Sequence, residues 1–281
     1  MTITIRTLTE ADLDIADVIM QAAYGGGSRK ARLQRYLALQ PEGWLLASLD
    51  GTPAGIGGAT NYGPFAYIGL VATHPTMQRR GVALALMERL LSWLDERGCP
   101  IVLLDASDAG APLYLRLGFV EEGKTLIFLQ DDCALRPPPS ESVRPLVAAD
   151  IPAVAAFDTP IFGADRSAVF ASHLADGPDR AFVALDSSGQ ITGHLFAQAQ
   201  TLGPWAARTP AAAAGLLAAA LSLPYDGAPG AIVPASNTAA TDMLMRYGFS
   251  PHRSTHHMRR GGDAAPGCRA LLYGQASLAI G

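Results

Sequence analysis

The pattern of apolar and polar positions in the first half of the chain predicts a mixed order of strands and helices. Short apolar runs are typical of buried strands, and they occur at residues 43–49, 54–60, 65–73 and 101–105. A wide apolar stripe at residues 78–97 recurs every four positions and predicts a long amphipathic helix that ends at Gly98. We expect a short helix at 111–117 and a terminal hairpin at 119–129 to complete this half.

The second half of the chain repeats the first one weakly. Residues 5–13, which predict a short strand entering a helix, are echoed at 143–151. Two further echoes follow in the same order, 47–51 at 184–189 and 116–119 at 246–249. Three consecutive prolines separate the halves and can neither continue a helix nor donate to a sheet. The sequence thus predicts tandem α/β (α+β) domains at 1–135 and 143–281, joined by a proline-rich linker at 136–142. Each domain should be a mixed, mainly antiparallel twisted sheet flanked by helices.

Composition and charge exclude several classes of protein. With 49% hydrophobic and 16% charged residues among 281, the chain has ample material for packed cores and is not a disordered protein. The net charge of -4 lacks the basic surface of a nucleic-acid binder. No apolar run approaches the ~20 residues of a membrane span, and the start of the chain lacks the pattern of a secretory signal. We therefore expect a cytoplasmic protein. Its three widely separated cysteines indicate neither disulfides nor a thiolate metal site.

The stretch from residue 70 to residue 83 carries the clearest chemical signal. A buried strand runs into a turn that opens the long helix, and Gly81 at this turn lets the backbone approach a ligand closely. The free amides of a first helical turn favour an anion, and Arg79 and Arg80 add positive charge beside them. This combination suits a pyrophosphate. The alternative is that Gly81 is only a packing point and that the arginines simply lie in solvent.

In this context the first half resembles the GCN5-related N-acetyltransferase (GNAT) superfamily. The acetyl-coenzyme A loop of that family has Gln or Arg, two residues, Gly, one residue, and then Gly or Ala. All fixed positions are met by Gln78-Arg79-Arg80-Gly81-Val82-Ala83. A second family landmark, Ala, Tyr and then Gly-Phe, is met with one residue fewer between Ala and Tyr, by Ala111, Tyr114, Gly118 and Phe119. The family often has Asn ahead of this helix, where the chain has Asp108 instead.

The resemblance implies direct acetyl transfer from acetyl-CoA, a cosubstrate, to an amine within a ternary complex. It implies that backbone amides near Leu70 and Val71 polarise the thioester carbonyl. The coenzyme-binding residues would be Leu70, Val71, Gln78, Arg79, Arg80, Gly81, Val82 and Ala83. Tyr114 would protonate the leaving thiolate, because a phenol of pKa ~10 and a thiol of ~8.5 have similar proton affinities. The alternative is that Tyr114 is only a core aromatic residue.

The sequence does not identify the general base that would accept the proton of the amine. Glu42, Asp105 and His74 are candidates by proximity, and none of them is singled out. We expect no metal site, because the adjacent His256 and His257 would point to opposite faces of a strand among basic neighbours.

The second half has no counterpart of the coenzyme loop, and Leu244 stands where the first half has Tyr114. It resembles the carboxy-terminal domain of some tandem bacterial acetyltransferases, which implies a role in binding or shaping the substrate. Asp158, Asp165 and Arg166 are therefore candidate substrate contacts. The alternative for these residues is helix capping and a surface ion pair.

Together these observations predict an N-acetyltransferase that acetylates a primary amine of a small molecule or metabolite. One alternative is an acyl-CoA sensing or scaffolding module without turnover. Another is a tandem acetyltransferase of the mycothiol synthase type, although there the second half should carry the loop. The expected partner is a small-molecule amine, preferably a cationic one, without nucleic acid or membrane, and a homodimer is left open.

Overall fold

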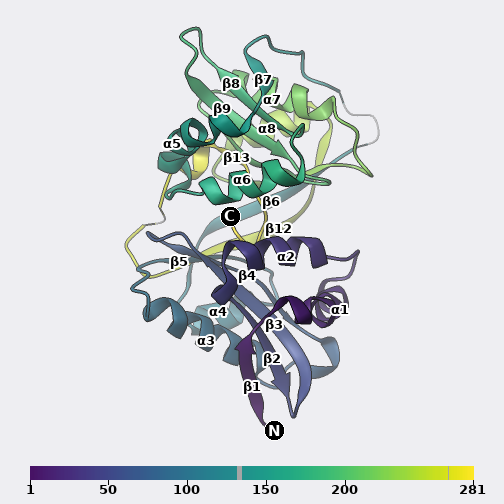
Figure 1. Cartoon of the computed structure of the whole chain (residues 1–281), viewed down its shortest axis with the longest axis vertical. Coiled ribbons are helices and arrows are strands. Elements are labelled where there is room, and N and C mark those ends of the chain that lie inside the picture. The colour runs from purple at the N-terminus through teal and green to yellow at the C-terminus, as the bar shows by residue number, and fades with distance from the viewer. Residues whose placement is uncertain (132–134, 265) are drawn as a thin grey trace. The chain divides into compact units, whose positions relative to one another are not determined.

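The computed structural model describes residues 1–131, 135–264 and 266–281, and one order of elements occurs twice along them (Figure 1). The first occurrence comprises β1 (Ile3–Thr7), α1 (Leu13–Tyr24), α2 (Lys30–Leu39), β2 (Trp44–Leu49), β3 (Thr52–Asn61), β4 (Ala66–Thr73), α3 (Val82–Asp95), β5 (Val102–Ala106), α4 (Ala111–Arg116) and β6 (Val120–Gln130). The second comprises β7 (Val143–Pro145), α5 (Ile151–Phe162), α6 (Ser167–Asp176), β8 (Ala181–Leu185), β9 (Ile191–Ala197), β10 (Leu202–Ala207), α7 (Pro210–Leu221), β11 (Gly230–Pro234), α8 (Thr238–Arg246) and β12 (Phe249–Arg260). A last strand, β13 (Leu272–Gly274), follows the repeat. The duplicated α/β fold predicted from the sequence is confirmed.

Packing divides the chain at a different place from the repeat. One compact unit comprises Met1–Leu104 with Arg259–Asp263 and Ile280, and the other comprises Asp105–Met258 with Ala264–Ala279 and Gly281. The sequence repeat and the packed units are thus two different divisions of the chain. The domain bounds 1–135, 136–142 and 143–281 stay a prediction, and residues 132–134 lie outside the described part.

In the first unit, the strands follow the order β1-β2-β3-β4-β5, with parallel pairing between β4 and β5 and antiparallel pairing elsewhere. The Trp44 ring stacks on Tyr36 at 5.4 Å between centroids, and its Nε1 donates to the Tyr36 carbonyl at 3.0 Å. A Cβ at Gly58 would lie 2.0 Å from this indole ring, so only glycine fits there. The apolar stripe of α3 is buried at Leu86, Leu90 and Leu94.

In the second unit, five strands follow the order β13-β10-β9-β8-β7, and three more follow the order β12-β6-β11. The core is centred on Trp205, which is fully buried together with Ala213, Leu216, Leu217 and Ala220 of α7. Although β6 belongs to the first repeat, it lies between two strands of the second repeat. Its antiparallel register with β11 runs from Leu129 opposite Gly230 to Thr125 opposite Pro234.

The expected hairpin at 119–129 is wrong, because this segment is one continuous strand of 11 residues. Its strand partners come from residues about a hundred positions further along the chain, a distance at which local sequence patterns carry no pairing signal. This placement also explains why residues 105–131 pack with the second unit.

Candidate functional site

A β-bulge in β4 marks the centre of the candidate site in the first unit. Ile56 pairs with Ala72 and Gly58 pairs with Gly69, so two steps along β3 correspond to three steps along β4. The extra residue falls at Leu70 and Val71, the two positions predicted to present amides. Leu70 has a φ of 52°, which a leucine adopts only when its surroundings hold it there. The bulge takes these backbone groups out of the regular ladder.

The loop after β4 leads directly into an uncapped helix start. Arg79 has a φ of 61° and Gly81 a φ of 86°, and α3 begins at Val82 rather than at Gln78 as the sequence predicted. The predicted start is wrong because these left-handed residues interrupt the helical backbone that the apolar stripe suggested. Gly81 has no side chain to cap the helix, so the amides of the first turn are left without an intrahelical partner.

The predicted coenzyme-binding residues are brought together around this loop. The side chains of Gln78, Arg79 and Arg80 are exposed, and neither arginine has an acidic partner among the described residues. Ala83 lies in the first turn of α3 and Leu70 and Val71 lie in the bulge. An uncapped helix start with free positive charge beside it is an arrangement that binds phosphate groups.

Tyr24, which sequence reasoning missed, also belongs to this region. It is the last residue of α1, and its hydroxyl donates to the Val71 carbonyl at 2.8 Å. The pairs Tyr24-Gly25 and Phe162-Gly163 occupy equivalent positions in the repeat, and this echo could have drawn attention to the residue.

Tyr114, the predicted acid, lies on α4 in the second unit. Its side chain is buried, and its ring meets Phe119 edge to face at 5.9 Å between centroids. Burial raises the pKa of Tyr114 to about 12, so the phenol keeps its proton at neutral pH. This protonation state is the one a general acid needs, and the catalytic role itself stays a prediction.

The three candidate bases are all engaged by neighbouring groups. Glu42 forms an ion pair with Arg97 at 2.5 Å, and the His74 Nδ1 lies 2.9 Å from the Thr76 hydroxyl. The Asp105 side chain is fully buried and accepts hydrogen bonds from the Thr125 hydroxyl at 2.6 Å and from the Gln275 amide at 3.0 Å.

Burial alone would raise the pKa of Asp105, but several neighbours outweigh it and lower the pKa to about 2. These neighbours are His257, through a hydrogen bond and its charge, the Arg269 charge, and the Thr125 hydrogen bond. A carboxylate held in this way is a weak proton acceptor. The base therefore stays open.

The predicted substrate contacts have different surroundings from those expected. Asp158 and Arg166 are 0% and 2% exposed, and their side chains form a double hydrogen bond at 2.7 and 2.9 Å inside the second unit. The surface ion pair expected for them is wrong, because His194 and aromatic rings enclose both charges. Asp165 is exposed and accepts from the Ser167 amide at 2.8 Å, which forms an Asx turn ahead of α6, and the N-cap residue of that helix is Arg166. The substrate role of all three stays a prediction.

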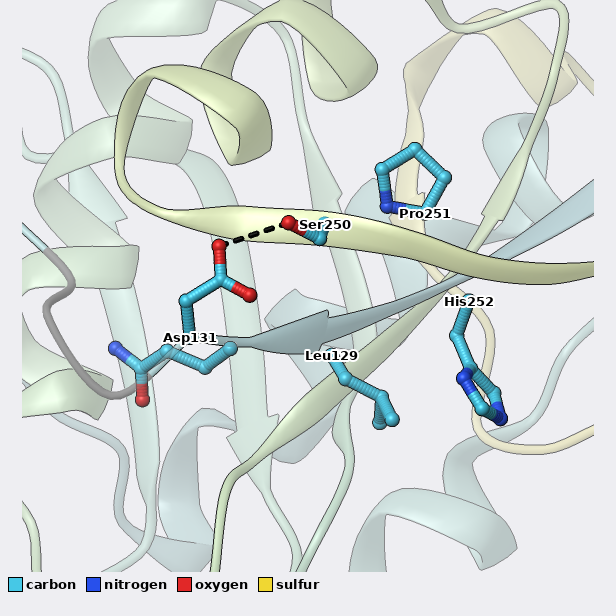
Figure 2. A pocket seen from close by; sticks show the side chains of 6 residues that line it. Leu129, Asp131, Ser250, Pro251 and His252 are labelled. Atoms are coloured by element: carbon cyan, nitrogen blue, oxygen red, sulfur yellow. Dashed lines mark hydrogen bonds between the residues drawn. The ribbon is translucent and has the colours of Figure 1, made fainter.

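A hollow of about 450 Å³ lies elsewhere in the second unit, where β6 ends and β12 begins. Figure 2 shows the Ser250 hydroxyl donating to Asp131 at 2.8 Å, while the His252 ring points away from this pair. Ser250, Asp131 and His252 therefore do not form the relay of a hydrolase. None of the predicted site residues lines this hollow.

The described residues contain neither a metal-binding cluster nor a membrane-spanning helix. Residues 1–131, 135–264 and 266–281 contain no group of three or more His, Cys, Asp or Glu side chains that could hold a metal ion. Within the same residues, no helix is long and apolar enough to cross a membrane. Cys99 and Cys268 are free thiols, and Cys133 lies outside the described residues.

Two family models match the chain, one in each half. The acetyltransferase (GNAT) family matches residues 14–119, and an acetyltransferase (GNAT) domain matches residues 154–274. An acetyltransferase from Yersinia pestis (strain Pestoides F) is 34% identical over 109 residues, which cover 35% of this chain and 76% of that relative.

Solved structures that match nearly the whole chain share its fold. A Pyrococcus horikoshii protein that is provisionally described as an acetyltransferase superimposes with a TM-score of 0.88 at 28% identity, over 99% of this chain and 96% of that one. A GCN5-related N-acetyltransferase from Sphaerobacter thermophilus gives a TM-score of 0.69 at 16% identity, over 92% of this chain and 95% of that one, and shares the fold.

Proposed function

Because the chain belongs to the acetyltransferase (GNAT) family and is an acyltransferase, we propose that it transfers the acetyl group of acetyl-CoA to a primary amine of a small molecule or metabolite. The observation that carries the proposal is the uncapped start of α3 next to the bulge in β4. Acetyl-CoA supplies an activated thioester and a pyrophosphate. The residues present fit both groups, since free amides and free positive charge occur together at this place.

The first-turn amides of α3 would hold the pyrophosphate, and Arg79 and Arg80 would supply a positive rim. The Leu70 and Val71 amides would donate to the thioester oxygen, where negative charge develops as the amine attacks. Direct transfer forms the C–N bond and breaks the C–S bond while both substrates are bound. The amine proton goes to a base, and Tyr114 would return a proton to the thiolate.

The net charge of -4 favours a cationic amine as the acceptor, because an acidic protein attracts positively charged solutes. The same net negative charge repels nucleic acid, so nucleic acid is not among the proposed partners.

A matched pair of glycine variants tests the proposed coenzyme site. Gly81 and Gly98 are both exposed, both have a positive φ, and lie at opposite ends of α3. Gly81→Glu should weaken acetyl-CoA binding by about tenfold or more in calorimetry, because it adds negative charge at the anion site. Gly98→Glu introduces the same side chain under similar strain and should bind acetyl-CoA like the wild type.

Turnover is then measured as thiol release with a panel of primary amines, for the wild type and for Tyr114→Phe. Binding without thiol release on any amine would favour the sensing module over the enzyme. If Gly81→Glu and Gly98→Glu bind acetyl-CoA equally well, the placement of the pyrophosphate is wrong.

A further inference from the structure

The corner between α1 and α2 is tied to the bulge in β4 by one side chain. The Tyr24 hydroxyl donates to the Val71 carbonyl at 2.8 Å, although the Tyr24 side chain is 47% exposed. Because the bulge interrupts the ladder around Val71, this hydrogen bond adds a fixed point where the regular strand pairing is lost.

The position of Tyr24 is in turn held by the residues of the corner. The Arg29 guanidinium lies 5.5 Å from the centre of the Tyr24 ring, a cation–π distance. The Arg29 amide donates to Asp17 at 2.6 Å, and the Gln21 side chain donates to the same buried carboxylate at 2.7 Å. The corner is therefore held by contacts among its own residues, and these contacts give the hydroxyl a defined direction.

The second repeat offers an internal comparison. There α5 ends at Phe162, and the Arg166 guanidinium lies 4.0 Å from the centre of that ring. The aromatic residue and its arginine are kept, and the hydroxyl is absent. A bulge also occurs in β10, where Leu202 pairs with Ala197 and Trp205 with Leu195.

The extra residue of this second bulge falls at Gly203 and Pro204, and a proline has no N–H to donate. The second repeat thus lacks both the hydroxyl at the end of the helix and one of the two amides in the bulge. The first repeat has both. The hydroxyl and the second bulge amide thus occur together in the first repeat and are both missing from the second, which indicates that they serve the same purpose.

We propose that Tyr24 is a positioning residue, whose hydroxyl fixes the Val71 carbonyl and thereby keeps the neighbouring bulge amide aimed at the thioester oxygen. The role rests on the proposed function, since it requires the acyl group to bind at the bulge. Tyr24 touches neither the reacting atoms nor the coenzyme in this role, and it acts through the backbone of Val71.

Tyr24→Phe tests the role, because it removes one oxygen and keeps the ring under Arg29. We expect kcat to fall about two- to tenfold, the range that one hydrogen bond supports, while the affinity for CoA without its acetyl group stays the same. The matched control is Tyr225→Phe, which removes a hydroxyl that donates to the Ala220 carbonyl at 3.0 Å in the second unit. This control should leave kcat unchanged.

Hydrogen exchange of the backbone around Val71 gives a second measurement that needs no turnover. In the protein without ligand, Tyr24→Phe should speed exchange at the bulge about two- to tenfold, and Tyr225→Phe should not. Unchanged exchange would show that the hydroxyl does not order the bulge. Faster exchange with an unchanged kcat would make the contact merely structural, and an equal loss of CoA and acetyl-CoA affinity would do the same. A wild type that does not bind acetyl-CoA would overturn the proposed function and this role with it.

Discussion

The two repeats keep the same strand bulge and the same helix after it, but they differ in the residues at the bulge and in the capping of the helix. In β4 the bulge presents Leu70 and Val71, while in β10 it presents Gly203 and Pro204. At the following helix, α3 starts at an uncapped glycine. The start of α7 is closed, because the Thr209 side chain accepts from the Ala212 amide at 3.2 Å. The difference teaches that two copies of one fold can present different sets of N–H donors, and the proposed coenzyme site lies in the copy that presents more of them.

The helical corners differ in a complementary way. In the first repeat, the Tyr24 and Arg29 side chains meet where the corner is partly open to solvent. In the second, Arg166 is buried against Phe162 and paired with Asp158, and the His194 Nε2 donates to the same carboxylate at 2.8 Å. The corner after the first helix is thus partly exposed in the first repeat, at the candidate site, and it is buried in the core in the second repeat.

The largest expected effect is on the free energy of unfolding, when the buried carboxylate of each corner is replaced by an amide. Asp158→Asn leaves the Arg166 charge buried without its counterion, and we expect a loss of about 3–5 kcal/mol in the free energy of unfolding. Asp17→Asn in the first repeat removes hydrogen bonds without stranding a buried cation, so it should cost about 1–2 kcal/mol. Chemical denaturation measures both, and equal losses would contradict the comparison.

The same variant has a signature in acid. Burial would raise the pKa of Asp158, but the Arg166 charge and the His194 hydrogen bond hold it well below its usual range. A carboxylate with a lowered folded pKa stabilises the protein above its unfolded value of about 3.9, and this stabilisation is lost as the pH falls below that value. Asp158→Asn should therefore show a flatter decline of stability below about pH 4 than the wild type.

The next effect concerns the two bulges. Val71→Pro removes from the first repeat the N–H donor that the second repeat lacks at Pro204. We expect kcat to fall about 10²–10³-fold, the usual cost of losing one oxyanion donor. Val71→Ala keeps the amide and serves as the control. Thermal unfolding of both variants separates loss of the donor from loss of the fold. A folded Val71→Pro variant with normal turnover would rule out the Val71 amide as a donor.

The smallest effect concerns the two helix starts. Thr209→Ala removes the cap of α7, which should cost about 1 kcal/mol of stability, measured by denaturant titration. It should not create a second coenzyme site, because Pro204 still lacks an amide and no arginine pair precedes this helix. Calorimetry should therefore give one acetyl-CoA per chain for wild type and variant alike, and a second binding event would contradict the argument.

Much of the fold could be predicted from the sequence, because each element has a local signal. The strands at 43–49, 54–60 and 65–73 follow from short apolar runs, and they are confirmed as β2, β3 and β4 with small shifts at their ends. The position of the loop before α3 follows from Gly81 and its neighbours. These signals all lie within a few residues of what they predict.

What could not be predicted depends on contacts between distant residues. Three contacts join segments that are far apart in the sequence: the pairing of β6, the hydrogen bond between Tyr24 and Val71, and the hydrogen bond between His194 and Asp158. A buried ion pair and an exposed one contain the same residue types, so composition alone does not separate them. The left-handed backbone of Arg79, which delays the start of α3, has no residue signature because arginine rarely adopts it.

The placement of β6 has a consequence for how the protein is made on the ribosome. This strand leaves the ribosome a hundred residues before β11, a delay of roughly 5–20 s at about 5–20 residues per second. During that interval its edges have no partner from the second repeat and could pair with a neighbouring nascent chain. Glu121, Glu122 and Lys124 place charges along the waiting strand and discourage such pairing. The sequence therefore has to protect β6 from pairing with other chains during synthesis, in addition to specifying its contacts in the folded protein.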